Sequence, residues 1–255
     1  MSARVQLEIA CGSLRSALAA QAGGADRVEL FADPAAGGTT PSHGTLALVR
    51  DRVRLPLFVL VRPRGGDFLY DEAEVEAMLA DIEHCRRLGC DGLVLGALTA
   101  DADIDMTVCR ALVEAAGGLP VTFHRAFDAA RDPRRALEAI IQLGCTRVLS
   151  SGGQASAPAG AAALAARVAQ SRGRIGVMAG AGVTAANVTG LVRRSGCVQV
   201  HASARRMRAS SMRWLNASLQ GLAPAHPESD VGEIAALRAA LDSLGPEAGD
   251  GDPTR

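Results

Sequence analysis

The stretch that decides the fold is VQLEIACGSLRSALAAQAGGADRVEL, residues 5–30. It opens with an apolar strand pattern over Val5–Ala10. A helical pattern follows over Ser13–Ala22, with Ser13 as a plausible N-cap and Gly23–Gly24 as a stop. A second strand pattern lies at Arg27–Leu30. A helix between two strands returns the chain to the edge where the first strand began, so the two strands are expected to run parallel. Residues 5–30 therefore predict a strand–helix–strand unit of a parallel sheet.

The same unit recurs along the chain. The expected strands lie at Val5–Ala10, Arg27–Leu30, Leu57–Arg62, Gly92–Leu95, Val121–His124, Arg147–Leu149, Ile175–Met178 and Val198–His201. The expected helices lie at Ser13–Ala22, before Asp51, and at Asp71–Leu88, Met106–Ala116, Asp132–Leu143, Ala157–Ser171, Thr184–Arg194 and Val231–Leu244. Eight strand–helix units in about 250 residues suit a closed (β/α)8 TIM barrel. We predict one such α/β domain over residues 1–245, with residues 246–255 as a disordered C-terminal tail.

Composition narrows the classes of function. The 255 residues are 48% apolar and carry 27 basic and 27 acidic side chains, with 3% aromatics. This balance disfavours nucleic-acid binding, which needs phosphate-neutralising charge and stacking surfaces. The apolar runs have strand length and are too short to cross a bilayer, and Met1–Gln6 lacks a secretory segment. We therefore expect no membrane partner and a cytoplasmic location.

The six cysteines, at positions 11, 85, 90, 109, 145 and 197, are scattered singly and form no C-x-x-C pair. We expect buried, reduced thiols rather than a disulfide framework.

The chain contains no lysine, and all 27 of its basic residues are arginine. Schiff-base and pyridoxal-phosphate chemistry need a lysine amine, and a Walker phosphate loop needs its lysine. These classes are excluded. The available groups are arginine, histidine, carboxylates, thiols, backbone amides and metal ions.

Chemically active residues sit at the ends of the expected strands, and in a TIM barrel such residues meet at one mouth. The candidates are Glu8, Glu29, Arg62, His124 and His201. The carboxylates and imidazoles could serve as catalytic acids and bases, while Arg62 could anchor an anionic group. The same groups could instead hold a divalent metal ion, or form a purely structural ion-pair network.

Three loops are candidates for anion binding. The first loop is Arg62-Pro-Arg-Gly-Gly-Asp67, in which Arg62 and Arg64 lie beside two glycines. It is either a loop that binds an anion or a tight exposed turn. The loops at Ser150–Gln154 and Gly180–Gly182 offer amides of the kind that cradle phosphate, although simple turns would look the same. The candidate residues there are Ser151, Gly152, Gly180 and Gly182.

Two further features stay open. Asp128 could orient His124, or it could begin the turn toward Asp132, an N-cap candidate ahead of Pro133. For a soft metal, Cys11 lies just past the first strand and Met178 ends the seventh. They are weak candidates for metal ligands.

Several of these motifs together resemble the CutC family, usually labelled copper homeostasis proteins. The matching segments are Leu7–Ile9, Gly23–Leu30, Gly37–Ser42, Arg62–Phe68, Val121–Asp128, Gly180–Val183 and Val200–Ser203. The resemblance implies a cytosolic α/β barrel that tends to form homo-oligomers, here a dimer or tetramer. It also implies a link to copper binding, and copper is the only cofactor suggested, on this ground alone. It implies no established reaction.

The chain departs from the family pattern at two positions. Members commonly carry a cysteine after the first strand's Leu-Glu-Val/Ile and another after Arg-Val/Ile-Glu-Leu, where this chain has Ala10 and Phe31. Three hypotheses follow: a copper-associated binding protein, an enzyme acting on a small anionic and perhaps phosphorylated molecule, or a noncatalytic oligomeric scaffold. The missing cysteines favour the enzyme.

Overall fold

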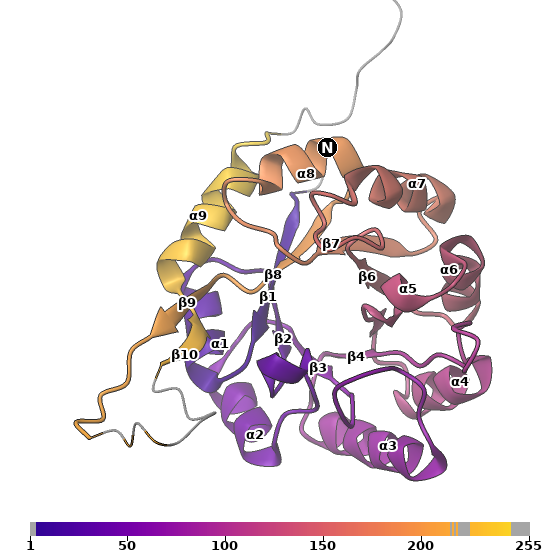
Figure 1. Cartoon of the computed structure of the whole chain (residues 1–255), viewed down its shortest axis with the longest axis horizontal. Coiled ribbons are helices and arrows are strands. Elements are labelled where there is room, and N and C mark those ends of the chain that lie inside the picture. Colours follow the sequence, from indigo (N-terminus) through magenta and orange to yellow (C-terminus); the bar gives the residue numbers. More distant parts are fainter. Residues whose placement is uncertain (1–3, 215, 217, 219–224, 246–255) are drawn as a thin grey trace, which may run out of the picture.

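Eight parallel strands close into a barrel in the chain order β1 to β8 (Figure 1). The computed structural model describes residues 4–245, except 215, 217 and 219–224. The first strand pairs with β2 on one side and with β8 on the other, which closes the sheet. Helices surround the barrel (Figure 1). The predicted (β/α)8 TIM barrel is confirmed, while the predicted tail at 246–255 lies outside the described residues.

The strands are short and mostly buried. The barrel strands are β1 Gln6–Cys11, β2 Arg27–Leu30, β3 Leu57–Leu60, β4 Gly92–Leu95, β5 Val121–Phe123, β6 Arg147–Ser150, β7 Gly176–Gly180 and β8 Gln199–Ala202. A separate two-stranded antiparallel sheet joins β9 Arg205–Arg208 to β10 His226–Ser229. Burial of both faces explains why the barrel strands appear in the sequence as nearly continuous apolar runs.

Most of the helices begin at a side-chain cap that the sequence offers. They are α1 Leu14–Ala22, α2 His43–Arg52, α3 Glu72–Arg87, α4 Met106–Ala115, α5 Ala126–Ala129, α6 Pro133–Gln142, α7 Ala161–Ser171, α8 Val188–Ser195 and α9 Val231–Asp242, with a 3₁₀ turn η1 at Pro34–Ala36. Ser13 caps α1, and Asp71 and Glu74 form a capping box on α3. Asp132 caps α6, with Pro133 at its first position, as predicted.

Alternation along the strands separates two cores. Ile9 and Cys11 belong to the large core that also contains residues of the surrounding helices. Ala10 and Phe31 belong to a small cluster with side chains from β3 and β4, inside the barrel. Because side chains alternate between the two faces of a strand, Glu8 and Glu29 also point inward.

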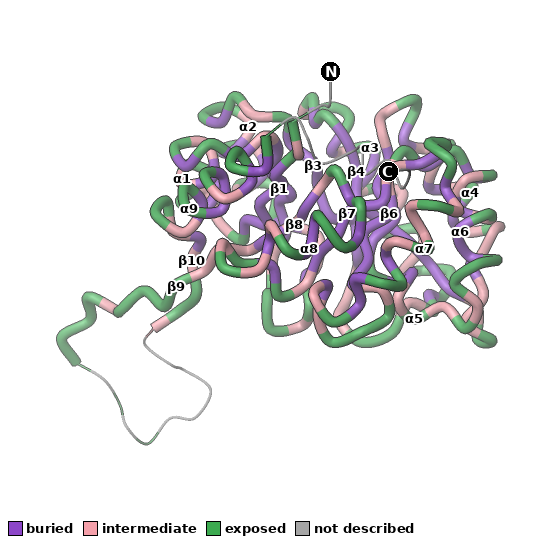
Figure 2. Tube along the Cα trace, turned by 90° about the horizontal axis from the view of Figure 1, so that it is seen from above, coloured by how far each residue is buried: buried purple, intermediate pink, exposed green. Residues whose placement is uncertain are grey.

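Some elements differ from the prediction. The last barrel-side loop contains β9 and β10, a region to which the sequence pattern assigned no element. Helix α7 begins at Ala161 rather than Ala157, and α8 at Val188 rather than Thr184. In each preceding loop a side chain accepts a hydrogen bond from the backbone: Asn187 Oδ1 from the Thr184 N–H, and Ser156 Oγ from the Ala159 N–H. Figure 2 shows the chain beyond β9 leading away from the barrel as an exposed segment.

All six cysteines are buried and unpaired, in agreement with the sequence interpretation. Among the described helices, none combines the length and apolar character needed to cross a membrane.

Candidate active site

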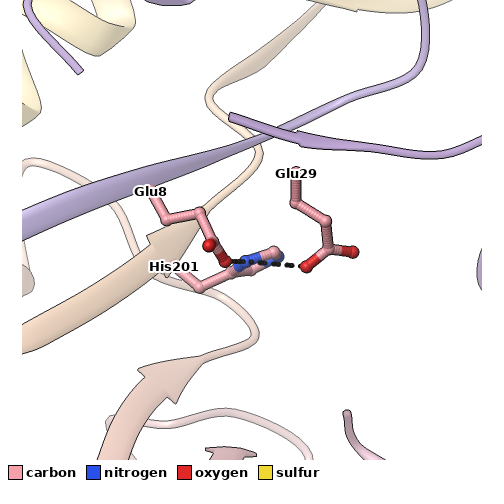
Figure 3. Close-up of side chains that lie close together, drawn as sticks. All are labelled: Glu8, Glu29 and His201. Carbon is pink, nitrogen blue, oxygen red and sulfur yellow. Dashed lines mark hydrogen bonds and ion pairs between the residues drawn. The ribbon is translucent and has the colours of Figure 1, made fainter. Parts of the chain in front are cut away.

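Three neighbouring strands bring Glu8, Glu29 and His201 together at the barrel mouth (Figure 3). Strand β1 lies between β2 and β8, and its register places Glu8 beside His201 and Ala10 beside Glu29. The His201 Nδ1 atom lies 2.7 Å from Glu8 Oε1 and 3.6 Å from Glu29 Oε2. The two carboxylates therefore face one imidazole nitrogen.

A buried arginine, Arg27, contacts the Glu8 carboxylate inside the barrel. The Nε–H of Arg27 donates to Glu8 Oε2 at 2.5 Å, so Glu8 is held between a guanidinium and an imidazole. The NH2 group of Arg27 also donates to Met178 Sδ at 3.4 Å and to Gln199 Oε1 at 3.3 Å. The Arg27 guanidinium lies 5.0 Å from the centroid of the Phe58 ring, inside the barrel. These contacts fix the position of the Glu8 side chain and favour its ionised form.

The two carboxyls have opposite pKa shifts. Burial alone would raise the pKa of Glu8, but the hydrogen bond from His201 and the charge of Arg27 outweigh it and bring that pKa to about 2. Burial raises the pKa of Glu29 to about 7, and the neighbouring Glu8 charge adds to the effect, against partial relief from His201. Glu29 Oε2 has no hydrogen-bond partner among the described residues. Near neutral pH, Glu29 can therefore accept or release a proton.

His201 has the complementary behaviour. Its burial would lower the pKa of the imidazole, but the charges of Glu29 and Glu8, together with the hydrogen bond to Glu8, raise it. A protonated His201 beside an ionisable Glu29 is a pair that can exchange a proton with a bound molecule. The ligand atoms of Glu8, Glu29 and His201 lie within 4.8 Å of one another, so the same group has the spacing to hold a metal ion.

His124 lies elsewhere at the mouth and has a different environment. Its Nδ1 accepts a hydrogen bond from the Ala126 N–H at 3.2 Å, and its Nε2 has no partner among the described residues. The ring packs against Phe68, with centroids 5.0 Å apart. Burial and the nearby charge of Arg62 lower the pKa of His124 to about 3, so the ring is neutral.

Arg62 donates most of its hydrogen bonds to backbone carbonyls. Its NH1 group donates to the carbonyls of Ala36 and Gly38 at 3.0 and 2.8 Å, and its NH2 group donates to Gly66 at 2.7 Å. Only Nε lacks a partner among the described residues. Arg62 thus ties two loops together beside the cavity, and a bidentate anion contact would require those bonds to break.

Arg64 lies outside the residues that form the mouth cavities. It pairs with Glu74 at 2.5 Å and with Asp67 at 3.0 Å, and its side chain is 40% exposed. The bonds to these carboxylates raise the pKa of Arg64. The contacts connect the loop after β3 to the first turn of α3.

The loop containing Ser151 and Gly152 is held by hydrogen bonds to the carboxylate of Asp128 in α5. Asp128 accepts hydrogen bonds from the Ser151 N–H at 2.9 Å, from the Gly153 N–H at 3.0 Å and from Ser150 Oγ at 2.6 Å. The Gly152 N–H donates to Ser150 Oγ. Asp128 therefore takes the place that a bound anion would have, and it neither orients His124 nor only opens the turn toward Asp132.

Gly180 and Gly182 lie nearer the charged group. Gly180 pairs with His201 in the β7–β8 register, and a Cβ atom there would lie 2.6 Å from Leu149 Cδ1. Gly182 has a φ of +66°, a conformation that favours glycine. Both glycines let the chain after β7 pass close to the mouth.

Two adjoining cavities open at the mouth, of about 450 and 500 Å³. Both are lined by Glu29, Gly37, Leu60, Arg125 and His201. The first extends under the loops after β7 and β8 and is lined also by Ala10, Phe31, Gly182 and Arg205. The second extends toward Arg62, Phe68 and His124. Volumes of this size suit a small molecule.

The structure does not bring Cys11 and Met178 together. Cys11 belongs to the core outside the barrel, where its Sγ–H donates to the Ile9 carbonyl at 3.4 Å and burial raises the pKa of the thiol. Met178 is buried and accepts from Arg27. Neither lines a mouth cavity.

Two arginines at the mouth were not predicted from the sequence. Arg27 shares a strand face with Glu29, a signal that could have indicated its inward position. Arg205 begins β9, in a segment without a recognisable strand or helix pattern, and nothing in the sequence marked it.

The fold and the site define an α/β barrel whose ionisable residues gather at the carboxyl ends of its strands. The CutC family profile matches residues 5–206. The CutC family protein of Chromobacterium violaceum is 52% identical over 241 residues, covering 92% of this chain and 98% of that protein. The corresponding protein of Bacteroides thetaiotaomicron is 50% identical over 217 residues, covering 85% and 87% of the two chains.

A solved structure agrees with the sequence relatives. CutC from Streptococcus agalactiae, described as a copper homeostasis protein, shares 32% identity at a TM-score of 0.75, covering 78% of this chain and 98% of that one. A thiamine phosphate pyrophosphorylase from Pyrococcus furiosus, at 14% identity and a TM-score of 0.59, covers 94% of this chain and 96% of its own length and shares the barrel fold alone. The chain belongs to the CutC family.

Proposed function

We propose that this CutC family member is an enzyme that acts on a small anionic substrate by acid–base chemistry at the barrel mouth. The observation that carries the proposal is the buried Glu8–His201–Glu29 group beside two small-molecule cavities. A carboxyl with a pKa near neutrality is suited to general acid–base catalysis at physiological pH.

The contacts of each residue indicate its role in the proposed reaction. Glu29 is the catalytic acid or base, because it lines both cavities and its carboxyl has an unpaired oxygen. His201 lies beside it in both cavities and supplies a second proton-transfer group. Glu8 is a positioning residue, since its carboxylate bonds to His201 Nδ1 and to Arg27. His124, neutral and stacked on Phe68, lines the second cavity.

The family label suggests copper, and the donor set does not fit a thiolate copper(I) site. Copper(I) prefers thiolate and thioether ligands. At the two family cysteine positions, Ala10 and Phe31 line the first cavity and offer no sulfur. Cys11 lies on the other face of its strand, and burial raises the pKa of its thiol. We therefore derive no step through copper.

Hydrogen exchange from solvent tests the proposal without knowledge of the reaction. The protein is incubated in D₂O with a panel of small organic phosphates and carboxylates, and deuterium incorporation is followed by mass spectrometry. We expect exchange at a carbon of at least one compound. Glu29→Gln should lower its rate by about 100-fold or more. Glu76→Gln, at an exposed position on α3, is the matched control and should retain the wild-type rate.

The opposite results are equally clear. Absence of exchange and of turnover across the panel would contradict the enzyme proposal, as would a Glu29→Gln variant with the wild-type rate. A rate abolished by a metal chelator and restored by a divalent ion would favour a metal held by the same three side chains.

We also propose that the protein works in the cytoplasm, as a homo-oligomer, without a nucleic-acid partner. Six buried free thiols suit a reducing compartment. Met207, Met212 and Trp214 are 66–71% exposed along the projecting segment and offer an apolar contact for a second copy. Light scattering tests the oligomeric state.

A further inference from the structure

One arginine at the mouth, Arg205, makes no ion pair with any residue that the structure describes. Arg205 begins β9 directly after the loop that follows β8, and it lines the first cavity. Its guanidinium lies 5.2 Å from the centroid of the Phe31 ring. Among the described residues it makes no ion pair and no side-chain hydrogen bond, although it is partly buried. A partly buried guanidinium that keeps all its donors is available for a ligand.

The loops beside Arg205 carry unused amides. The N–H groups of Gly182 and Val183, after β7, and of Ser203 and Ala204, after β8, have no acceptor among the residues that the structure describes. All four residues line the first cavity. A backbone N–H without an internal partner needs water or a ligand. The two loops that line the cavity beside Arg205 thus carry four such donors.

Two residues in the loops beside Arg205 have an uncommon backbone conformation. Ala181 and Ala204 have φ values of +81° and +45°, and both line the first cavity. Left-handed backbone is unfavourable for alanine, and such residues concentrate at ligand sites. The conformation at Ala204 comes immediately before Arg205, where the chain turns from β8 into β9.

The negative charges near Arg205 have other partners. Glu233 lines the same cavity, but its Oε1 accepts from Arg206 at 2.5 and 2.8 Å. Glu29 faces His201. The corner between the loops after β7 and β8 therefore offers N–H donors and the Arg205 guanidinium, and the carboxylate that lines it, Glu233, is paired with Arg206.

We infer that this corner binds the phosphate group of a small phosphate monoester, and that Arg205, held over Phe31, is the residue that recognises it. The inference deepens the proposed function, on which it rests for the chemistry at the other end of the cavity. The phosphate oxygens take the Arg205 fork and the amides of Gly182 and Ser203. The remainder of the molecule then extends toward Glu29 and His201. A cavity of about 450 Å³ has room for both the phosphate and the organic part of such a molecule.

The inference also assigns the anion contact to a different arginine from the one that the sequence indicated. Arg62 gives NH1 and NH2 to backbone carbonyls, whereas Arg205 gives none. Phe31, which replaces a cysteine of the family pattern, supplies the flat face under the guanidinium. The Arg205 guanidinium therefore lies over Phe31, one of the two positions at which this chain departs from the family pattern.

Calorimetric titration of the full chain with inorganic phosphate and with glycerol 3-phosphate tests the inference, and acetate probes a carboxylate ligand. We expect both phosphates to bind, with Arg205→Gln weakening them at least tenfold and Arg205→Lys weakening them by less, because lysine keeps the charge but not the fork. Arg193→Gln, at an exposed position on α8, is the control and should leave binding unchanged. Ligand-free melting curves verify that each variant folds.

Each of the other possible results contradicts one specific part of the inference or of the proposed function. Equal phosphate affinity in wild type and Arg205→Gln removes Arg205 from the site, and an equal loss in Arg193→Gln shows general attraction by surface charge. Acetate binding that exceeds phosphate binding contradicts the phosphate class. Glu29→Gln should still bind phosphate. A protein that binds phosphate without catalysing exchange refutes the proposed function alone, and one that exchanges carboxylates without binding phosphate refutes this inference alone.

Discussion

Glu29 and Asp128 are two carboxyls at the same barrel mouth with almost equal burial, at 8% and 9% side-chain exposure. Asp128 accepts hydrogen bonds from both Ser150 and Ser151, from the Gly153 amide and from Arg125, which together outweigh its burial and lower its pKa. Glu29 has no such donors, and its pKa rises to about 7. Side chains of similar exposure therefore have opposite pKa shifts: hydrogen-bond donors stabilise the Asp128 carboxylate, whereas Glu29 has the neighbouring Glu8 charge beside it.

The same contrast holds for Arg62 and Arg205. Arg62 donates to three backbone carbonyls and connects two loops. Arg205 lies over Phe31 without an acceptor among the described residues. A charged group whose partners come from the protein supports the fold, whereas one left without partners at a cavity is available for a ligand.

The largest effect should come from the satisfied carboxyl. Asp128→Ala leaves the Ser151 and Gly153 amides and Arg125 without their acceptor, and it should lower the free energy of unfolding by roughly 4 kcal/mol. Glu29→Gln at pH 5 should change it by less than about 1 kcal/mol, because a neutral amide then replaces a neutral carboxyl of similar shape. Guanidinium denaturation measures both. Similar losses for the two variants would erase the distinction between these carboxyls.

The pH dependence of stability sharpens the comparison. The folded pKa of Glu29 lies above the ordinary value of 4.5, so the folded state binds a proton that the unfolded chain has released. Its contribution is full below pH 4.5 and is lost as the pH rises through about 7. Relative to Glu29→Gln, wild type should lose on the order of 3 kcal/mol across this window. Melting temperatures of both proteins at pH 4.5–8 would measure the loss, and parallel curves would contradict the raised pKa.

For the arginines, Arg62→Lys should lower the free energy of unfolding by about 2 kcal/mol, since an ammonium cannot serve three carbonyls arranged around a planar fork. Arg205→Lys should stay within about 0.5 kcal/mol of wild type in the absence of ligand. Urea denaturation in phosphate-free buffer measures both variants. A larger loss at Arg205 than at Arg62 would reverse the assignment of their roles.

The smallest effect concerns copper(I). We expect wild type to retain no stoichiometric copper(I) against a competing chelator, because the mouth cavities offer no sulfur ligand. The double variant Ala10→Cys, Phe31→Cys should gain retention, since both positions line the first cavity. Tight retention by wild type that survives Cys11→Ser would show that other ligands suffice.

Periodicity was sufficient to predict the barrel, because each strand–helix unit carries its own apolar pattern and caps. It was also sufficient to bring Glu8, Glu29 and His201 together, since parallel strands end at the same mouth. The division of roles among the mouth residues could not be predicted. The donors of Arg62 are taken by carbonyls of loops whose conformations no local pattern specifies. Arg205 lies at the mouth directly after Ala204, whose left-handed backbone conformation no local sequence pattern indicates.

The replacement of two family cysteines by Ala10 and Phe31 bears on oxidative damage. As far as described residues form them, the walls of both mouth cavities contain neither thiol nor thioether, and the six cysteines are buried away from them. Peroxide oxidises accessible thiolates to sulfenic acid. A site built from carboxyls, imidazoles and guanidiniums offers peroxide no such target, whereas cysteines at positions 10 and 31 would place two thiols in the wall of the first cavity.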